Sequence, residues 1–296
     1  MAPIIRRFIT VSVVFTAVSL LLATAPLWVP LAWLTDTIKG GTLLRAIAFF
    51  LWLSLMEAMG IIVLLFIALA RPFVGKPRFQ TATFKLQCWW VKNIWAGACV
   101  LFRVKTEVED QHLLEKAPYI FAPRHCSTAD VMLPGLLASA KYGVRLRYVL
   151  KSELLWDPCL DIAGHNTPNI FVNRESGNTD RELEQIRQGM ANMQPNEGAL
   201  IYPEGTRFSI ERQRKIRDRL AQKLSANHPS LQLKNVLPAR PAGLFTIIDS
   251  VPKADVVFMA HYGFEGFRDI GQLVNGSALD TTCRCKIWRI PAYDIP

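Results

Sequence analysis

A histidine and an aspartate stand five residues apart, directly after an apolar run. The run, residues 118–122, indicates a buried strand; His125 follows it, and a helical pattern begins at Val131. On one continuous helix, positions five apart point about 140° away from each other, so His125 and Asp130 would not share a face. They can meet if His125 lies on the turn and Asp130 lies in the first turn of the next helix. We therefore predict a His–Asp pair at the carboxyl end of a strand, where open α/β sheets place their chemistry.

The same segment has a second interpretation. Ser127 lies three residues before Asp130, a spacing close to the capping box that begins many helices. Asp130 would then only cap a helix, and His125 would be a loop residue. Cys126 is a rival nucleophile, but neighbouring side chains diverge in extended or turn backbone. A dyad of Cys126 and His125 is therefore geometrically poor.

Two further strand ends carry candidate ligands for an anion. Arg174 follows the strand candidate 169–173, and the segment Tyr-Pro-Glu-Gly-Thr-Arg ends at Arg207. Gly205 lets the backbone approach a ligand closely. Two arginines at neighbouring strand ends suit a cluster of anionic oxygens such as a phosphate.

Taken in chain order, these segments resemble the first three sequence blocks of the 1-acylglycerol-3-phosphate O-acyltransferase family, within the glycerolipid (lysophospholipid) acyltransferase superfamily. The blocks are His125-x4-Asp130, Phe-Val-x-Arg ending at Arg174, and Pro-Glu-Gly-Thr-Arg at 203–207. The segment Leu-Pro-Ala-Arg-Pro-Ala-Gly at 237–243 resembles the fourth block. Its form is nearer the branch of YihG-type bacterial proteins and eukaryotic lysocardiolipin acyltransferases. The resemblance covers roughly residues 100–265.

The chain departs from the family pattern in the first block. Arg124 stands where the family usually has an asparagine, and residues 126–129 keep little of the usual serine and aromatic content. Lys151 matches a lysine that recurs in the family after the third strand.

The resemblance implies direct acyl transfer. His125 would be the general base on the acceptor hydroxyl, and Asp130 would hold its tautomer and stabilise the imidazolium. Backbone amides would stabilise the oxyanion. Arg174 and Arg207 would bind the acceptor phosphate. The implied acceptor-site residues are Glu204, Gly205, Thr206 and Lys151. Arg124 and Arg240 are two further candidates. No metal and no cofactor are expected beyond the acyl-CoA or acyl-acyl carrier protein co-substrate.

The implied function is a membrane-bound acyltransferase that converts 1-acyl-glycerol-3-phosphate (lysophosphatidic acid) to phosphatidic acid. One alternative is acylation of another lysophospholipid, such as lysophosphatidylglycerol or lysocardiolipin. A second alternative is a catalytically weak lipid-binding or scaffold protein of the membrane. The expected partners are the lysophospholipid, the acyl thioester, membrane lipids and acyl carrier protein.

Composition fits a membrane-associated protein of modest size. The 296 residues are 51% hydrophobic with a mean hydropathy of +0.20, which indicates one domain of roughly 200 residues plus a membrane element. The net charge of +10 suits nucleic acid, anionic lipid or phosphorylated substrates. Apolar segments at the front favour lipid, and we expect no nucleic-acid partner because no such motif stands out. The six cysteines lack framework spacing, which predicts reduced thiols.

The first 75 residues predict an N-terminal hydrophobic helical hairpin that anchors the protein to the membrane. Its apolar segments are Phe8–Leu34 and Ala46–Ala70, each long enough for a bilayer that needs about 20 residues. Pro26 and Pro30 interrupt the first segment, and the turn runs through Asp36 to Gly41. A cleaved signal is the competing interpretation, opposed by Pro26 after the Ala-Thr-Ala sequence and by the second apolar segment. The hydropathy of the two segments fits a hairpin that crosses the bilayer and a hairpin that dips into one leaflet equally well.

Basic residues flank the hairpin on both sides, which puts both ends in the cytoplasm. We expect the inner membrane, with the active site on the cytoplasmic side. The ionisable Glu57 falls within the second apolar segment, where it is either functional or faces a partner helix. Residues 79–102 are rich in tryptophan and phenylalanine; they predict either an amphipathic helix at the headgroup level or a helix whose aromatics pack on the sheet.

Residues 76–296 predict an α/β domain with a largely parallel sheet flanked by helices, because strand-like and helix-like runs alternate. The expected strands are 104–108, 119–122, 146–150, 169–173, 199–202, 254–260 and 284–290. The expected helices are 131–141 and 180–193. Pro134 removes the amide that would bond the carbonyl of Asp130, so a kink is expected there. Residues 209–235 are polar with clustered arginines and predict a solvated helix and loop.

Overall fold

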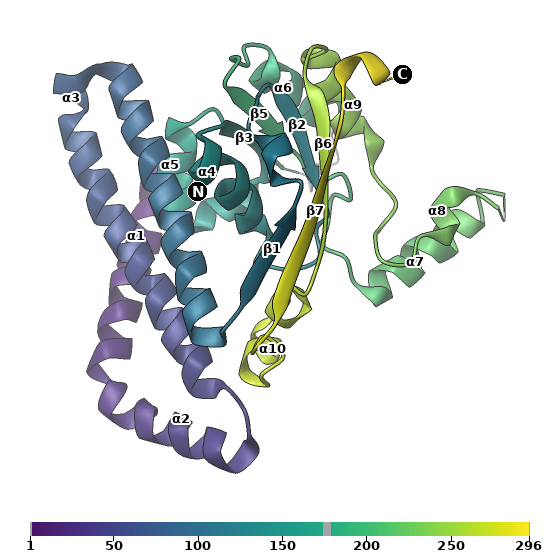
Figure 1. Cartoon of the computed structure of the whole chain (residues 1–296). Helices are drawn as coiled ribbons and strands as arrows, with labels where there is room; N and C mark the ends of the chain where they lie inside the picture. The colour runs from purple at the N-terminus through teal and green to yellow at the C-terminus, as the bar shows by residue number, and fades with distance from the viewer. Residues whose placement is uncertain (1, 174–178, 226, 296) are drawn as a thin grey trace.

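In a computed structural model, which describes residues 2–173, 179–225 and 227–295, a seven-stranded sheet is flanked by helices (Figure 1). The predicted α/β architecture is confirmed. The strands are β1 (Lys105–Glu109), β2 (Tyr119–Pro123), β3 (Arg145–Lys151), β4 (Ile170–Val172), β5 (Glu197–Leu200), β6 (Asp255–Tyr262) and β7 (Thr282–Ile290).

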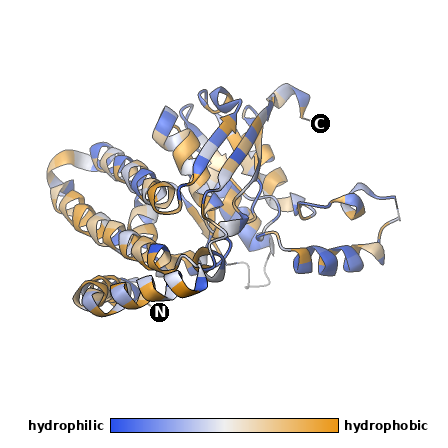
Figure 2. Cartoon of the chain, turned by 60° about the horizontal axis from the view of Figure 1, so that its bottom comes forward, coloured by the Kyte–Doolittle hydropathy of each residue, from blue (hydrophilic) through white to orange (hydrophobic). Residues whose placement is uncertain are grey.

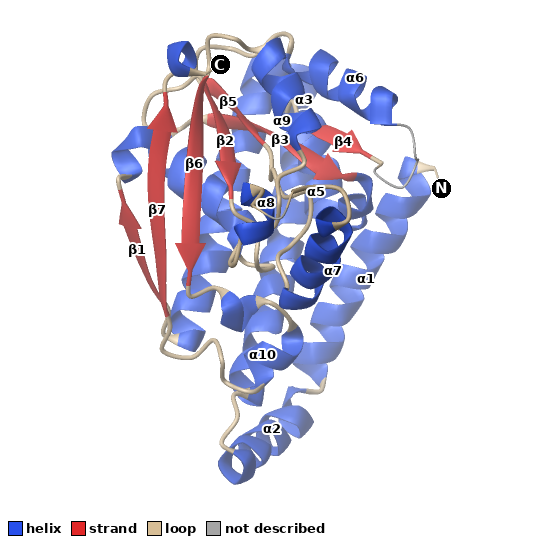
Figure 3. Ribbon diagram, turned by 90° about the vertical axis from the view of Figure 1, so that its right-hand side faces the viewer, coloured by secondary structure: helices blue, strands red, loops and turns tan. Residues whose placement is uncertain are grey.

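The sheet is mostly parallel, in the order β1-β7-β6-β2-β5-β3-β4. β6 and β7 pair antiparallel, and every other neighbouring pair is parallel (Figure 3). β2 lies between β5 and β6, with Phe121 opposite Leu200 on one side and Val257 on the other. The carboxyl ends of β2, β3, β4, β5 and β6 therefore meet at one edge of the sheet.

Alternating side chains of β2 enter two separate cores. Tyr119 and Phe121 pack in one core, together with Trp95 and Phe102. Ile120 packs in the other, which includes Ile186 and other apolar residues of α6 (Thr179–Met190) and α9 (Pro241–Ser250). Side chains that alternate between two cores, with a period of two residues, are typical of a strand that is buried on both faces. It fixes β2, and the turn that follows it, in the centre of the domain.

Three apolar helices precede the sheet: α1 (Pro3–Ala23), α2 (Ala25–Lys39) and α3 (Leu43–Phe102). The first apolar segment is thus broken at Thr24, two residues before Pro26. The turn predicted over Asp36 to Gly41 is present but begins later, because α2 continues to Lys39: Gly40 takes a left-handed conformation, and the Asp36 carboxylate accepts the amides of Leu43 and Leu44 at 2.7 and 2.8 Å. α1 and α3 are each long and apolar enough to cross a membrane, by length and composition.

α3 is a hairpin of two helical arms rather than one rod. The reversal lies at Gly75, whose φ of 74° and ψ of 165° favour glycine. The second arm packs Trp95, Ala98 and Phe102 into the sheet's core, so these two aromatics pack against protein, whereas Trp89 on the same arm is 38% exposed. Glu57, on the first arm, is buried against α5 (Pro158–Asn166), where its backbone carbonyl accepts the Cys159 thiol at 3.5 Å.

Apolar side chains gather on one side of the molecule. The hydrophobic colour of Figure 2 is concentrated on the helices near the N-terminus, whereas the segment projecting on the opposite side is largely hydrophilic. That projecting segment holds α7 (Ile210–Ala221), none of whose residues is buried, and α8 (Pro229–Gln232). The prediction of a solvated helix in residues 209–235 is confirmed for α7.

The helix predicted over 131–141 is wrong in type. The segment instead forms a 3₁₀ turn, η2 (Asp130–Met132), a π-helical turn, η3 (Gly135–Ser139), and one turn of α-helix, α4 (Ala140–Tyr142). Pro134 lies between the first two. The carbonyl of Asp130, deprived of a Pro134 amide, accepts the amide of Leu133 instead. The interruption expected at Pro134 is therefore present, and the segment changes between 3₁₀, π-helical and α-helical geometry along its length.

The remaining short helices connect these elements. They are η1 (Gln111–Leu114), η4 (Ser152–Trp156), η5 (Glu265–Phe267), α10 (Ile270–Val274) and η6 (Ala292–Asp294).

Candidate active site

His125 and Asp130 meet on the turn after β2, called here the 124–130 turn. His125 Nδ1 lies 2.8 Å from Asp130 Oδ1, with the histidine side chain 16% exposed and the aspartate fully buried. The predicted geometry is confirmed: His125 is on the turn and Asp130 opens η2. Because Nδ1 is engaged by the carboxylate, Nε2 is the ring nitrogen left to exchange a proton with a ligand.

The second carboxylate oxygen of Asp130 organises the backbone. Oδ2 accepts the amides of Cys126 and Ser127 at 2.6 and 2.7 Å, and Ser127 Oγ accepts the amide of Asp130 at 3.0 Å. This reciprocal pattern is a capping box. Both sequence interpretations of Asp130 are therefore realised at once, one by each oxygen.

Glu204 is the residue that joins this turn to its neighbours. Its Oε1 accepts the amide of His125 at 3.1 Å, and its Oε2 accepts the amide of Leu237 at 2.9 Å. Burial raises the pKa of Glu204, and the two backbone hydrogen bonds oppose that rise. The first, third and fourth sequence blocks thus meet at one buried carboxylate. Glu204 occupies its oxygens with the protein's own amides, rather than presenting them to a ligand.

The other residues of the third block surround the same turn. Tyr202 places its ring 4.5 Å from the His125 ring, between centroids, and its hydroxyl is buried without a hydrogen-bond partner within the described part of the chain. Gly205 takes a φ of 69°, which turns the chain back so that its amide bonds the carbonyl of Tyr202 at 3.0 Å. Thr206 is half-buried in the turn that follows.

Arg207 lies at the rim of the site. Its Nη1 donates to Thr128 Oγ1 at 2.7 Å, and the next residue, Phe208, donates its amide to the carbonyl of His125 at 2.7 Å. Arg207 is exposed and hence accessible to a ligand. Its predicted partner in phosphate binding, Arg174, lies outside the described residues.

Three further predicted residues have separate positions. Lys151 ends β3 at the same edge of the sheet, with an exposed side chain. Arg240, also exposed, donates its amide to the carbonyl of Pro203 at 2.8 Å just before α9. Arg124 turns back toward β6, where Nη1 donates to the carbonyl of His261 at 2.5 Å, and its guanidinium lies 5.5 Å from the centre of the Phe208 ring.

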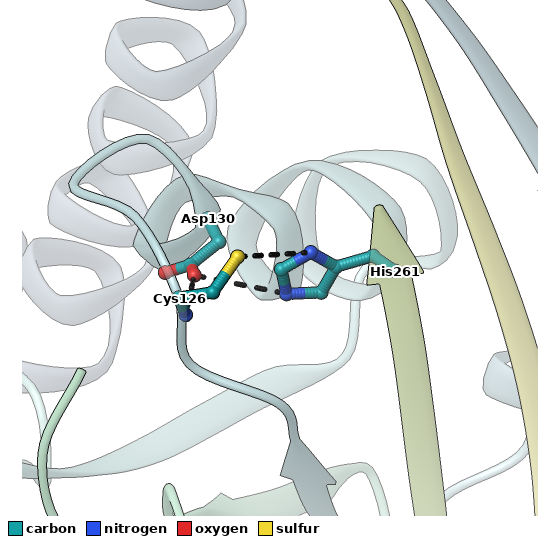
Figure 4. A group of neighbouring side chains, drawn as sticks. All are labelled: Cys126, Asp130 and His261. Atoms are coloured by element: carbon teal, nitrogen blue, oxygen red, sulfur yellow. Dashed lines mark hydrogen bonds and ion pairs between the residues drawn. The ribbon is translucent and has the colours of Figure 1, made fainter. Parts of the chain in front are cut away.

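His261 completes the buried side of the turn and was missed from the sequence. Its Nε2 donates to the carbonyl of Arg124 at 3.0 Å and lies 3.7 Å from Asp130 Oδ2; its Nδ1 lies 3.8 Å from Cys126 Sγ (Figure 4). Burial lowers the pKa of His261. Burial also raises the pKa of Cys126 to about 12, so its thiol is neutral and can donate to Nδ1.

Cys126, Asp130 and His261 have metal-ligating side chains with ligand atoms within 4.8 Å of one another. The chemistry of the donor set does not fit a metal ion. Cys126 faces Nδ1 of the His261 ring and Asp130 faces Nε2 (Figure 4). A single metal ion binds only one of these two ring nitrogens, so it could not be shared by all three side chains.

Comparison with known proteins adds three findings. Residues 105–231 match the family model Acyltransferase. The mouse 1-acyl-sn-glycerol-3-phosphate acyltransferase epsilon is 27% identical over 153 residues; the match covers 51% of this chain and 41% of that protein. The chain thus spans about two fifths of this curated relative. The fold resembles the Thermotoga maritima 1-acyl-sn-glycerophosphate (LPA) acyltransferase PlsC, with a TM-score of 0.61, 15% identity, and coverage of 86% and 87% of the two chains.

Proposed function

We propose that the chain, which carries an acyltransferase domain similar to those of the 1-acylglycerol-3-phosphate O-acyltransferase family, transfers a fatty acyl group to the free hydroxyl of a lysophospholipid. The proposed acceptor is 1-acyl-glycerol-3-phosphate and the product is phosphatidic acid. The observation that carries this proposal is the 2.8 Å contact between His125 Nδ1 and Asp130 Oδ1, which leaves Nε2 as the base, on a turn whose Thr128 accepts a hydrogen bond from Arg207.

In the proposed reaction, His125 Nε2 takes the proton from the acceptor hydroxyl as the oxygen attacks the thioester carbonyl. Asp130 holds the other ring nitrogen and stabilises the imidazolium. Collapse of the tetrahedral intermediate breaks the carbon–sulfur bond, and the imidazolium returns its proton to the leaving thiolate. Backbone amides near the turn are assigned to the oxyanion. No covalent acyl-enzyme forms, because the acceptor oxygen attacks the donor directly.

Arg207 is assigned to the acceptor phosphate because it is exposed at the rim and its guanidinium is held by Thr128. Glu204, by contrast, is assigned to the architecture of the site. The proposed donor is an acyl-CoA or an acyl carrier protein thioester. The exposed apolar faces of α1, α2 and α3 support association with the membrane that contains the acceptor. We place the protein at the inner membrane with its site on the cytoplasmic side.

The test is an assay of the full-length protein with a panel of lysophospholipids and both donor types, read by mass spectrometry. His125→Ala is expected to abolish product formation while the protein stays in the membrane fraction. His112→Ala is the matched control, because His112 is exposed on η1. Unchanged turnover by His125→Ala would exclude the mechanism. Absence of product from the unaltered protein across the whole panel would exclude the function.

A further inference from the structure

A cavity of about 400 Å³ opens next to the 124–130 turn, and its walls are unusually basic. Arg207, Arg212, Lys215 and Arg268 line it, with Glu211 as the one acidic residue. The cavity adjoins the proposed active site, since Arg207 bonds Thr128 and Phe208 bonds the carbonyl of His125. A molecule in this cavity therefore contacts residues that are hydrogen-bonded to the 124–130 turn.

Most of the positive charge of this cavity is uncompensated. Lys215 pairs with Glu211 at 2.7 Å. Within residues 2–173, 179–225 and 227–295, the guanidinium groups of Arg207, Arg212 and Arg268 have no carboxylate within 4.0 Å. Three like charges around one cavity repel each other, and a bound anion would relieve that repulsion.

The three arginines are also connected to one another. Arg212 Nη1 donates to the carbonyl of Arg207 at 3.0 Å, and Ser209 Oγ accepts the amide of Arg212 at 3.2 Å at the start of α7. Thr128 accepts from Arg207 and donates to the carbonyl of Arg268 at 3.2 Å. These bonds hold the three residues around one space while leaving most guanidinium N–H groups available.

We propose that Arg212 and Arg268 bind a second phosphate group of a substrate, in addition to the phosphate assigned to Arg207. This inference rests on the proposed function. A guanidinium binds phosphate oxygens through two parallel N–H groups, so three arginines supply more donors than one phosphate monoester requires. The second phosphate belongs either to an acceptor with two phosphates or to the CoA part of the donor.

The experiment uses Arg212→Ala and Arg268→Ala, with Arg217→Ala as the matched control on α7 outside the cavity. The acceptors are lysophosphatidic acid, with one phosphate, and lysocardiolipin, with two. The donors are an acyl-CoA and an acyl-pantetheine thioester, which has no phosphate. Both variants are expected to lose about ten- to hundredfold in kcat/KM only in reactions whose substrate carries the second phosphate.

Each outcome has one meaning. Loss confined to lysocardiolipin identifies the acceptor as the source, and loss confined to acyl-CoA identifies the donor. Equal loss with every pair of substrates, or kinetics that match Arg217→Ala, would overturn the subsite. If the unaltered protein turns over no pair at all, the proposed function itself fails.

A separate observation concerns His261, and from it we infer a positioning residue for the His125–Asp130 pair. The last backbone bond between β2 and β6 at this end runs from the Arg124 amide to the carbonyl of Met259, at 2.9 Å. The chain then turns away from β6, which leaves the Arg124 carbonyl without a backbone donor from that strand. The imidazole of His261 supplies the donor, and Arg124 Nη1 returns a bond to the carbonyl of His261.

This contact lies immediately before the reacting residue. The held carbonyl belongs to the peptide that joins Arg124 to His125, and the adjacent amide of Cys126 bonds Asp130. Loss of the His261 bond would let both ends of the catalytic pair shift. A displacement of about 1 Å in such a pair can lower the rate about 100-fold.

The test compares His261→Gln, whose amide nitrogen can replace Nε2, with His261→Leu, which has no donor. His112→Leu is the control at an exposed histidine. His261→Leu is expected to lower kcat about 100-fold, leave KM unchanged and shift the pH profile of kcat, with His261→Gln restoring most of the rate. If His261→Leu only lowers the melting temperature, or if His261→Gln is no better than His261→Leu, the positioning role is wrong.

Discussion

Glu204 accepts the backbone amide of His125 at 3.1 Å, from a loop that lies 79 residues further along the chain. The same carboxylate accepts the amide of Leu237. Three loops are thereby fixed around one buried side chain, and the position of His125 depends on a residue outside the His125–Asp130 pair.

Replacement of Glu204 should therefore damage structure and activity together. Glu204→Ala leaves two buried amides without acceptors, so we expect a loss of about 2–4 kcal/mol in the free energy of unfolding and most of the activity. Glu204→Gln keeps one acceptor oxygen and should be intermediate. Thermal denaturation with parallel assays measures both. If Glu204→Ala keeps its melting temperature but loses acceptor binding, the residue contacts substrate instead.

Asp130→Asn separates proton chemistry from capping. The amide oxygen can still accept from the backbone amides of Cys126 and Ser127, but an amide N–H group facing His125 Nδ1 favours the wrong tautomer. We expect kcat to fall by about 10³-fold or more, with little change in melting temperature. Steady-state kinetics measure the change in kcat, and a thermal denaturation curve measures the change in melting temperature. A fall in stability proportional to the fall in activity would mean that Asp130 acts mainly as a cap.

The amino end of α1 is fixed to the catalytic domain by a buried charge. Arg6 and Arg7 donate to the Asp161 carboxylate in α5 at 2.9 to 3.2 Å. Burial raises the pKa of Asp161, but the hydrogen bonds from Arg7 and Arg6 outweigh it, and the net pKa is lowered. The stability from this contact is therefore fully present above the usual aspartate pKa of about 3.9 and is lost as pH falls through the lower folded-state value.

We accordingly expect Asp161→Asn to lower the melting temperature at neutral pH. The difference from the unaltered protein should stay constant down to about pH 5 and shrink below about pH 4. Asp294→Asn, at an exposed position on η6, is the control. A difference that grows as the pH falls would contradict the assigned direction of the pKa shift.

The two arms of α3 are in close contact at Gly97. A Cβ there would lie 2.2 Å from Trp52 Nε1, which donates to the carbonyl of Asn93 at 2.9 Å. Gly97→Ala should force the indole to move, at a cost of about 1–3 kcal/mol. Thermal denaturation and tryptophan emission report the change. Gly143→Ala offers a contrast, because it meets no atom within 4 Å but has a φ of +75°; it should cost only its backbone strain.

The strands were predictable because their signal is local. Runs such as 119–122 are apolar, short and bounded by turn residues, and all seven expected strands are present. The capped turn was also predictable, since the spacing of Ser127 and Asp130 allows few geometries. The 131–141 segment was not, because the effect of Pro134 extends into a π-helical turn that has no sequence period of its own.

The missing parts of the site depend on pairings between distant segments. His261 lies one residue beyond an expected strand, and nothing near it in sequence indicates that β6 is the neighbour of β2. The resemblance assigned Glu204 to the acceptor site, and its two amide partners could not be foreseen because they come from other loops. The reversal at Gly75 was missed because many single glycines between two apolar segments do not change the direction of the chain.

The reversal at Gly75 has a consequence for the dimensions of the molecule. A straight helix of the length of α3, 60 residues, would extend about 90 Å, roughly three times the hydrocarbon thickness of a bilayer. Folding at one glycine shortens that reach to about half and returns the chain alongside its own path. Ala46, near the start of the first arm, and Phe102, at the end of the second, thereby reach the same core beside the sheet, an arrangement that a non-glycine residue at position 75 would disrupt.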